Sequence, residues 1–181
     1  MKTMIMSLLI SLFFLPSFAQ QSTIYHFKKP SNIGGWVVID DIVMGGISKG
    51  TLKMHPDGYG VFEGDVSLEN NGGFSSIRYR FDKIKVNATN KISFRVKGNK
   101  NSFQLRVKES AQTEYSYIAE FATSGSWQTI EISLKDMYPS YRGRKLNRPN
   151  FSHNQIEEIT FLIGNGKAEK FQLLIDKIEV E

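Results

Sequence analysis

Apolar and polar residues alternate with a period of two through the middle of the chain. The apolar positions of its three clearest segments are Ile77, Tyr79 and Phe81, then Ile92, Phe94 and Val96, then Phe103, Leu105 and Val107. Side chains of a strand point alternately to its two faces, so each segment predicts a strand with one buried face. The residues between the apolar positions include Arg78, Arg80, Arg95, Lys97, Arg106 and Lys108. We therefore expect neighbouring strands with a basic exposed face.

Other short apolar runs extend this pattern over most of the chain. They cover residues 24–27, 36–39, 46–54, 61–68, 115–121, 127–134, 159–163 and 171–180. Pro56-Asp57-Gly58 predicts a turn, and a change of parity between Ile175 and Ile178 predicts a bulge. Residues 135–155 show no periodicity beyond one helical turn at 134–138. About ten short strands predict an all-β fold, an antiparallel β-sandwich of jelly-roll type with one long polar loop.

The first 19 residues have the pattern of a secretory signal peptide. Lys2 precedes an apolar run from Met4 to Leu15, and small residues end the segment at Ala19. The run is too short for a membrane span, which needs about 20 apolar residues. We expect residues 1–19 to be removed, residues 20–181 to form a single domain, and the protein to be exported to the periplasm or secreted, with no membrane span after cleavage.

Charge and cysteine content narrow the class of partner. Removing residues 1–19, whose one charged residue is Lys2, lowers the formal net charge from +5 to +4. Such a mild and dispersed excess, on an exported protein, argues against nucleic acid as a partner. The chain has no cysteine, so packing rather than disulfide bonds must stabilise it outside the cytoplasm.

Paired polar residues and two Gly-Gly pairs mark the stretch from Trp36 to Phe74. Its candidate ligand-binding residues are Asp40, Asp41, Asn70 and Asn71, and Asp40, Asp41 and Glu69 are candidate oxygen ligands of a structural calcium ion. The alternative is that these side chains accept hydrogen bonds from the backbone of the tight turns that the glycines form.

The expected basic face is a second candidate site. Arg78 and Arg106 represent it, because guanidinium groups bind carboxylates of an acidic polysaccharide or of a partner protein. The alternative is a solvated face that cross-strand acids such as Glu120 and Glu131 neutralise.

A third candidate lies in the long polar connection. Tyr141, Arg142 and Arg144 combine an aromatic ring, which stacks on sugars, with anion-binding guanidinium groups on an expected loop. The alternative role for Arg142 is to anchor this loop on Asp40 or Asp41.

The sequence offers few candidate catalytic residues. His26, His55 and His153 are isolated, without metal-ligand spacing, and there is no cysteine nucleophile. We therefore expect no catalytic residues. An alternative is a carbohydrate-active enzyme that uses a carboxylate pair from Asp40, Asp41 and Glu69.

Four segments resemble the complex I intermediate-associated protein 30 family. They are WVVIDDIVMGGIS, VFEGDVSLENNGGFSSIRYRF, Tyr141-Arg142-Gly143-Arg144 and the closing FQLLIDKIEVE. The resemblance implies a galactose-binding-like jelly roll, a fold shared with many carbohydrate-binding modules. In mitochondrial members it implies a non-catalytic, chaperone-like role in assembling a respiratory complex.

The expected signal peptide differs from the transit peptide of a mitochondrial member, which would be rich in arginine. We therefore expect this chain to act in another compartment. We therefore predict an exported, non-enzymatic binding module that engages a protein or glycan partner in the cell envelope. The alternatives are the carbohydrate-active enzyme and an assembly chaperone of an envelope complex.

Overall fold

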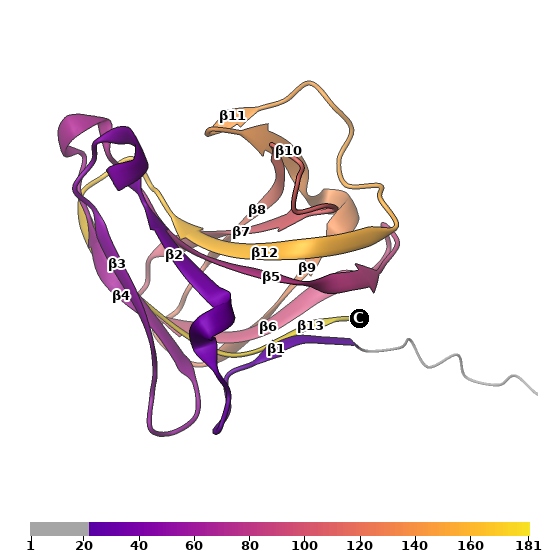
Figure 1. Ribbon diagram of the computed structural model, residues 1–181, viewed down its shortest axis with the longest axis horizontal. Helices are drawn as coiled ribbons and strands as arrows, with labels where there is room; N and C mark the ends of the chain where they lie inside the picture. Colours follow the sequence, from indigo (N-terminus) through magenta and orange to yellow (C-terminus); the bar gives the residue numbers. More distant parts are fainter. Residues whose placement is uncertain (1–21) are drawn as a thin grey trace, which may run out of the picture.

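Two antiparallel sheets packed face to face make up the computed structural model, which describes residues 22–181 (Figure 1). The expected signal peptide, residues 1–19, lies outside the described residues. Thirteen strands and four short 3₁₀ helices form this part of the chain. The prediction of an all-β sandwich is confirmed.

Sheet A is organised around the long C-terminal strand. Its strands, in spatial order, are β3 (Lys49–Met54), β4 (Gly60–Val66), β13 (Glu169–Val180), β6 (Lys91–Gly98) and β9 (Gln128–Ser133). The first strand, β1 (Ser22–His26), pairs with the end of β13 that β4 does not reach. The register of β13 on β6 shifts between Ile175 and Ile178, which confirms the predicted bulge.

Sheet B has seven strands in the described part of the chain. Its strands, in spatial order, are β11 (Arg144–Lys145), β10 (Tyr138–Tyr141), β8 (Ser116–Ala122), β7 (Ser102–Lys108), β12 (Gln155–Ile163), β5 (Ser75–Lys85) and β2 (Trp36–Asp40). The 3₁₀ helices are η1 (Ile33–Gly35), η2 (Asp41–Met44), η3 (Glu69–Asn71) and η4 (Leu134–Asp136). None of these helices is long and apolar enough to cross a bilayer.

The core lies between the sheets and is rich in phenylalanine. Phe62 and Phe94 from sheet A and Phe103 and Phe161 from sheet B are at most 1% exposed. The rings of Phe94 and Phe161 meet edge to face with centroids 5.4 Å apart. Each buried ring contributes about 1.5–3 kcal/mol, so the alternating apolar positions identified in the sequence account for the packing of the two layers.

Two predictions about neighbouring strands are wrong. The basic strands do not share one face, because β6 lies in sheet A and β5 and β7 lie in sheet B, with β12 between them. Arg95 and Lys97 are therefore on the opposite side of the molecule from Arg78 and Arg106. The polar segment 135–155 is also not one loop, since it contains β10 and β11, whereas η4 confirms the helical turn predicted at 134–138. Alternation cannot reveal which strands pair, because pairing depends on long-range contacts.

Candidate functional site

Asp41, one of the paired acids, is wholly buried and binds the chain at two turns. Its Oδ1 accepts a hydrogen bond from the backbone N–H of Ser48 at 2.9 Å. Its Oδ2 accepts from the N–H groups of Gly73 at 2.6 Å and Phe74 at 3.3 Å, and from the Ser48 hydroxyl. The carboxylate thus joins the turn after β2 to the turn before β5, as the structural alternative for these residues predicts.

These contacts favour the charged form of the Asp41 carboxyl. Burial by itself raises its pKa, but the hydrogen bonds from Ser48, Gly73 and Phe74 stabilise the carboxylate more strongly. The pKa of Asp41 is consequently lowered from the ordinary value of 3.8. A carboxylate with this many donors has no free oxygen to offer a ligand.

The two Gly-Gly pairs surround this carboxylate, and the members of each pair have different tasks. A Cβ on Gly46 would lie 2.3 Å from Asp41 Oδ1, and one on Gly72 would lie 2.6 Å from Oδ2. Gly45 and Gly73 have φ angles of 92° and 142°, which L side chains rarely adopt. One glycine of each pair makes room for Asp41, and the other turns the chain.

The Asn pair also serves the backbone. Asn70 and Asn71 are exposed and have φ angles of 53° and 61°, in the left-handed region that asparagine tolerates better than most residues. Glu69 precedes them on η3 and is exposed. The turn explains the sequence Asn-Asn-Gly-Gly without a ligand.

Asp40 faces the turn backbone as well, and the proposed calcium site is not assembled. Its Oδ1 accepts from the Ser75 hydroxyl at 2.6 Å and its Oδ2 from the Gly50 N–H at 3.1 Å. Within residues 22–181, no group of three or more His, Cys, Asp or Glu side chains is arranged to hold a metal ion. The prediction that Asp40, Asp41 and Glu69 together form a calcium site is therefore not supported by the geometry.

The outer face of sheet B presents a continuous row of side chains across six strands. Directly paired residues point to the same side of a sheet. From β10 to β2, the registers align Tyr138, Ile118, Arg106, Thr160, Arg78 and Val37. The sequence candidates Arg78 and Arg106 thus lie in one row, separated by β12.

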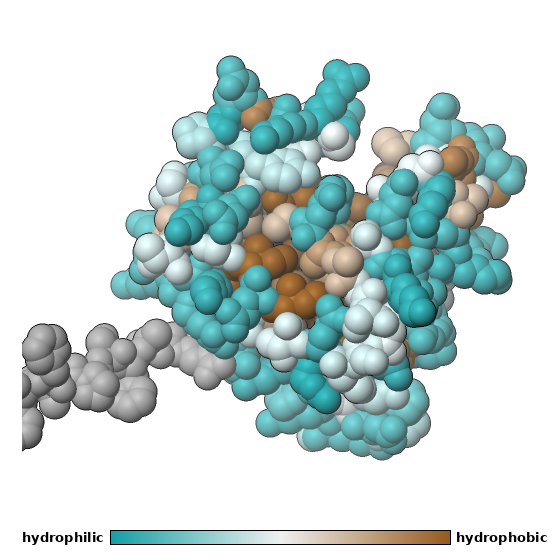
Figure 2. Space-filling model, turned by 180° about the vertical axis from the view of Figure 1, so that it is seen from behind, coloured by the Kyte–Doolittle hydropathy of each residue, from teal (hydrophilic) through white to brown (hydrophobic). Residues whose placement is uncertain are grey.

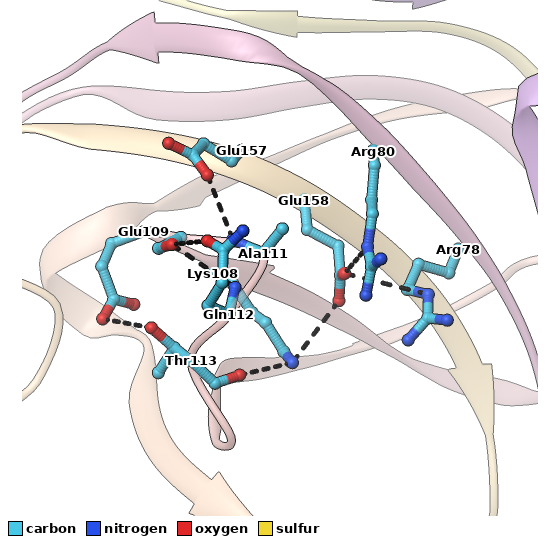
Figure 3. Close-up of polar contacts among 10 residues, drawn as sticks. Arg78, Arg80, Lys108, Glu109, Ala111, Gln112, Thr113, Glu157 and Glu158 are labelled. Carbon is cyan, nitrogen blue, oxygen red and sulfur yellow. Dashed lines mark hydrogen bonds and ion pairs between the residues drawn. The ribbon is translucent and has the colours of Figure 1, made fainter.

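A single carboxylate, Glu158, serves three cations of this face (Figure 3). Its Oε2 accepts a hydrogen bond from Arg80 Nε at 2.8 Å and lies 3.8 Å from Arg78 Nε. Its Oε1 lies 3.8 Å from Lys108 Nζ, which donates to the carbonyl of Thr113 at 2.6 Å. The side chain of Glu158 is 3% exposed, so its neighbours shield it from water on an otherwise open sheet face.

Glu120 and Glu131, the acids expected to neutralise the basic face, have other partners. Glu131 pairs with Lys91 on sheet A at 2.8 Å, and Glu120 accepts a hydrogen bond from the Gln104 amide at 3.4 Å. The sequence pattern did not single out Glu158, because Glu157 and Glu158 come just before an apolar run and resemble the polar end of a strand. Its parity with the outward-facing Thr160 and Leu162 was the available signal.

Arg106 is the cation of this face that no described carboxylate contacts. Its Nε and Nη2 donate to the Gln104 side-chain oxygen at 3.1 and 2.6 Å. Burial lowers the pKa of the Arg106 guanidinium, and the nearby Tyr138 opposes that effect. Arg106 is thus a partly desolvated cation that has only a neutral amide as its partner.

The Tyr-Arg-Gly-Arg motif forms the hairpin between β10 and β11. Tyr141 pairs with Arg144, so Arg142 and Gly143 are the two turn residues, with φ angles of 48° and 76°. Two positive φ values identify a type I′ turn, whose twist suits a hairpin. The Arg142 guanidinium lies 5.2 Å from the centre of the Tyr141 ring. The alternative that Arg142 anchors on Asp40 or Asp41 is wrong, because both carboxylates bind turn groups instead.

A cleft of about 750 Å³ lies between this hairpin and η2, over the end of sheet B. Arg106, Gln104 and Leu162 form its floor, Arg142 lines one rim, and Met44 lines the other. A smaller hollow of about 470 Å³, lined by Asn101 and Asn165 among others, adjoins it and shares Gln104 and Gly164. Figure 1 shows the β10–β11 hairpin and the η2 turn rising on opposite sides of sheet B, and Figure 2 shows the surface notched between them.

The η2 rim is unusually apolar for a surface turn. Ile42, Val43 and Met44 are 62%, 74% and 56% exposed, and Ile47 and Leu68 nearby are also exposed. Figure 2 shows apolar surface at the upper right, on the side where η2 and η3 lie. Asp41 holds this turn from beneath, so the buried acid shapes the rim without touching the cleft.

The three histidines lie in separate places. His153 is hydrogen-bonded to the Tyr117 hydroxyl at 2.8 Å, and His26 lies 3.4 Å from Asp176. His55 stacks on the Tyr59 ring with centroids 4.2 Å apart. Each therefore has a local structural partner.

Comparison with known proteins identifies both a family and a fold. The model of the family described as Complex I intermediate-associated protein 30 (CIA30) matches residues 25–175. The family 11 carbohydrate-binding module of a cellulosomal cellulase of Clostridium thermocellum has a TM-score of 0.67 and 16% identity, over 91% of this chain and 95% of the module. No curated protein matches the chain in sequence.

Two further structures extend the likeness. A family 11 module from Clostridium thermocellum in complex with a β-1,3-1,4-mixed-linked tetrasaccharide has a TM-score of 0.63 and 17% identity, over 88% of this chain and 94% of that one. An agarase has a TM-score of 0.57 and 12% identity, over 89% of this chain but 24% of its own length. At these identities the structures establish a shared fold.

Proposed function

This chain belongs to the complex I intermediate-associated protein 30 family, and from that membership and the geometry of sheet B we propose that it is an exported, non-enzymatic binding module. Its single domain, residues 20–181, binds a protein or glycan partner in the cell envelope. Export rests on the signal-peptide pattern of residues 1–19.

The observation that carries this proposal is the cleft on the outer face of sheet B. Two residue groups far apart in the sequence, η2 and the β10–β11 hairpin, form its rims, and the sheet forms a rigid floor. A concave site with a few convergent polar groups is typical of ligand recognition. Arg106 and Arg142 line the cleft, and Arg78 lies in the same row as Arg106 on the far side of β12. These three are the binding residues we propose. Tyr141 and Arg144 support the hairpin that carries Arg142.

The enzyme alternative loses its proposed residues in this geometry. A glycosidase needs two carboxyl groups on either side of an accessible bond. Asp41 is buried and fully hydrogen-bonded, Asp40 binds Ser75 and Gly50, and Glu69 lies on η3. The carboxylates of Asp40 and Asp41 are thus occupied by hydrogen bonds, which leaves Glu69 without either of them as a free catalytic partner. This favours a binding role over catalysis by a carboxylate pair.

A steric block of the cleft tests the proposal. Gln104 is half-buried and lines both hollows, so we expect Gln104→Trp to fill the floor and abolish partner binding. The matched control is Thr129→Trp, which puts the same bulk at an exposed position of β9 in sheet A. Residues 20–181 of each variant would be applied to a glycan array and to envelope extract, with quantification of bound partner.

The proposal fails if the wild-type protein binds nothing in either assay, or if Gln104→Trp retains every partner that Thr129→Trp retains. It stands if a saturable partner is lost in Gln104→Trp alone.

One observation favours the assembly chaperone as a second candidate. The exposed apolar side chains of Ile42, Val43 and Met44 form a surface that a partly assembled envelope subunit could cover. In that case Val43→Ser with Met44→Ser would abolish co-purification of a multi-subunit complex. Retention of the complex by this double variant would contradict the chaperone function.

A further inference from the structure

The spacing of two arginines on sheet B suits a repeating ligand. Arg106 on β7 and Arg78 on β5 flank Thr160 of β12 in one cross-strand row. Neighbouring strands are about 4.8 Å apart, so the two Cα atoms are separated by roughly 10 Å. Two linked sugar rings span a distance of this order. The row runs across the strands and so offers charges at intervals to an extended chain laid over the sheet.

The face carries more positive than negative charge. In the three cross-strand rows through Glu158, Thr160 and Leu162, the cations are Arg78, Arg80, Arg106 and Lys108, and the carboxylates are Glu158 and Glu120. Glu158 binds Arg80 closely and lies 3.8 Å from the nearest nitrogens of Arg78 and Lys108. Arg78 and Arg106 lie on strands that β12 separates. Like charges gathered on one face still repel each other, so a bound anion would stabilise this arrangement.

Two of these cations could form further hydrogen bonds or ion pairs. Arg78 Nε is buried and has no hydrogen-bond partner among the described residues. Arg106 donates to Gln104 alone, and burial lowers the pKa of its guanidinium. A desolvated guanidinium gains most from an anionic acceptor, because the attraction between opposite charges is stronger where water is excluded.

The polar lining of the cleft favours a saccharide over a peptide. Amide side chains of Gln104, Asn101 and Asn165 border the two adjoining hollows and can both donate to and accept from hydroxyl groups. The one aromatic ring of the row, Tyr138, has the ammonium of Lys145 5.1 Å from its centre. Charge rather than ring stacking is thus the main means of recognition that this face offers.

Resting on the proposed function, we infer that the ligand of this face is an acidic polysaccharide. Its carboxylate or sulfate groups pair with Arg106 and Arg78, its hydroxyl groups bind the amides of the cleft, and Arg142 reaches it from the hairpin rim. The inference specifies the chemical class of the ligand for the site proposed above.

Matched polysaccharides test the charge requirement. Polygalacturonate and its methyl ester carry the same sugar with and without charge, and a sulfated galactan with its desulfated form does the same for sulfate. We expect residues 20–181 to bind at least one acidic form at least about tenfold more tightly than its neutral counterpart. The affinity should fall as salt rises from about 0.01 to 1 M, over which the Debye length shrinks from about 30 to 3 Å.

Charge-removing variants locate the effect. Arg106→Gln should weaken binding of the acidic form by about tenfold or more, and the more exposed Arg142→Gln by about threefold. The matched control is Arg95→Gln, which removes a surface arginine from sheet A, where it pairs with Asp176 at 2.7 Å. It should leave the affinity unchanged. An unaltered unfolding midpoint would show that each variant is folded.

The outcomes separate this inference from the proposed function. Equal binding of the neutral and acidic forms, with loss of both in Gln104→Trp, would overturn the acidic class and leave the binding function intact. Binding of poly-glutamate but of no polysaccharide would also overturn it, in favour of an acidic peptide. If neither a polymer nor an envelope partner binds, the proposed function itself fails.

Discussion

Replacing Asp41 with asparagine tests whether the buried acid holds the two turns together. Asparagine has nearly the same shape, so the substitution changes hydrogen bonding and charge while leaving the packing intact. The neighbouring Asp40→Asn is the natural control. Its carboxylate accepts only two hydrogen bonds, one of them from the rotatable hydroxyl of Ser75.

The expected cost follows from the four donors that face Asp41. If the amide oxygen takes the place of Oδ2, it keeps Gly73, Phe74 and the Ser48 hydroxyl, but the amide nitrogen then faces the Ser48 N–H. A buried donor without an acceptor costs about 1–3 kcal/mol, and bonds to a neutral oxygen are each weaker by roughly 1 kcal/mol than bonds to a carboxylate. We expect Asp41→Asn to lower the free energy of unfolding by about 4–6 kcal/mol.

For Asp40→Asn we expect about 1 kcal/mol, since the Ser75 hydroxyl can turn to accept from the new amide. Guanidinium denaturation of residues 20–181, followed by tryptophan fluorescence, measures both values. In thermal unfolding Asp41→Asn should lower the midpoint by roughly 10 °C. A loss below about 1 kcal/mol, or one no larger than that of Asp40→Asn, would refute the reasoning.

Comparing the stability of wild type and Asp41→Asn over a range of pH tests the same interaction, and the direction of the change can be stated in advance. The pKa of Asp41 is lowered in the folded state, chiefly by hydrogen bonds that outweigh burial. Its contribution to stability is therefore complete above the unfolded pKa of 3.8 and is lost as the pH falls through the folded pKa. The stability difference between wild type and Asp41→Asn should narrow in that range. Glu63, whose pKa is lowered by the hydrogen bond from Lys53, titrates alike in both proteins and cancels.

Three further predictions concern the glycine contact, the shared carboxylate and calcium. Gly46→Ala places a Cβ 2.3 Å from Asp41 Oδ1 and should lower the free energy of unfolding by about 3 kcal/mol in denaturant titration; a neutral effect would contradict the close packing. Glu158→Gln removes the shared partner of Arg78 and Arg80 and should lower the free energy of unfolding by about 1–2 kcal/mol, since Arg80 is half-exposed and can be solvated instead. A stabilising effect at low salt would contradict the role of Glu158 as their shared partner. Calcium at millimolar concentration should leave the thermal unfolding midpoint unchanged, because the oxygens of Asp41 are already bonded, whereas a rise that a chelator reverses would restore the metal site.

The sequence predicted the layer architecture because burial on one face leaves a direct trace in it. The alternation at Ile77, Tyr79 and Phe81 gives β5 its inward face. The parity change after Ile175 gives the bulge of β13. Short strands β10 and β11 were missed because two to four residues are too few to show a period.

The candidate residues divided according to how far their partners lie along the chain. Asn70 and Asn71 fit a turn signal that the sequence itself contains, so the structural alternative could be stated for them in advance. The importance of Glu158 could not be foreseen in this way. Its partner Arg80 is 78 positions away in the sequence, and only the insertion of β12 between β5 and β7 brings the cations around it.

The stretch from Trp36 to Phe74 shows the same division. Local chemistry determines that its glycines form tight turns and that its acids need donors, because φ preferences and hydrogen-bonding capacity belong to each residue. The inward direction of Asp41 and the meeting of Arg106 with Arg142 across one cleft depend on the pairing of strands. Pairing is set by contacts between residues distant in sequence, which is why the tertiary structure alone decided where the candidate site lies.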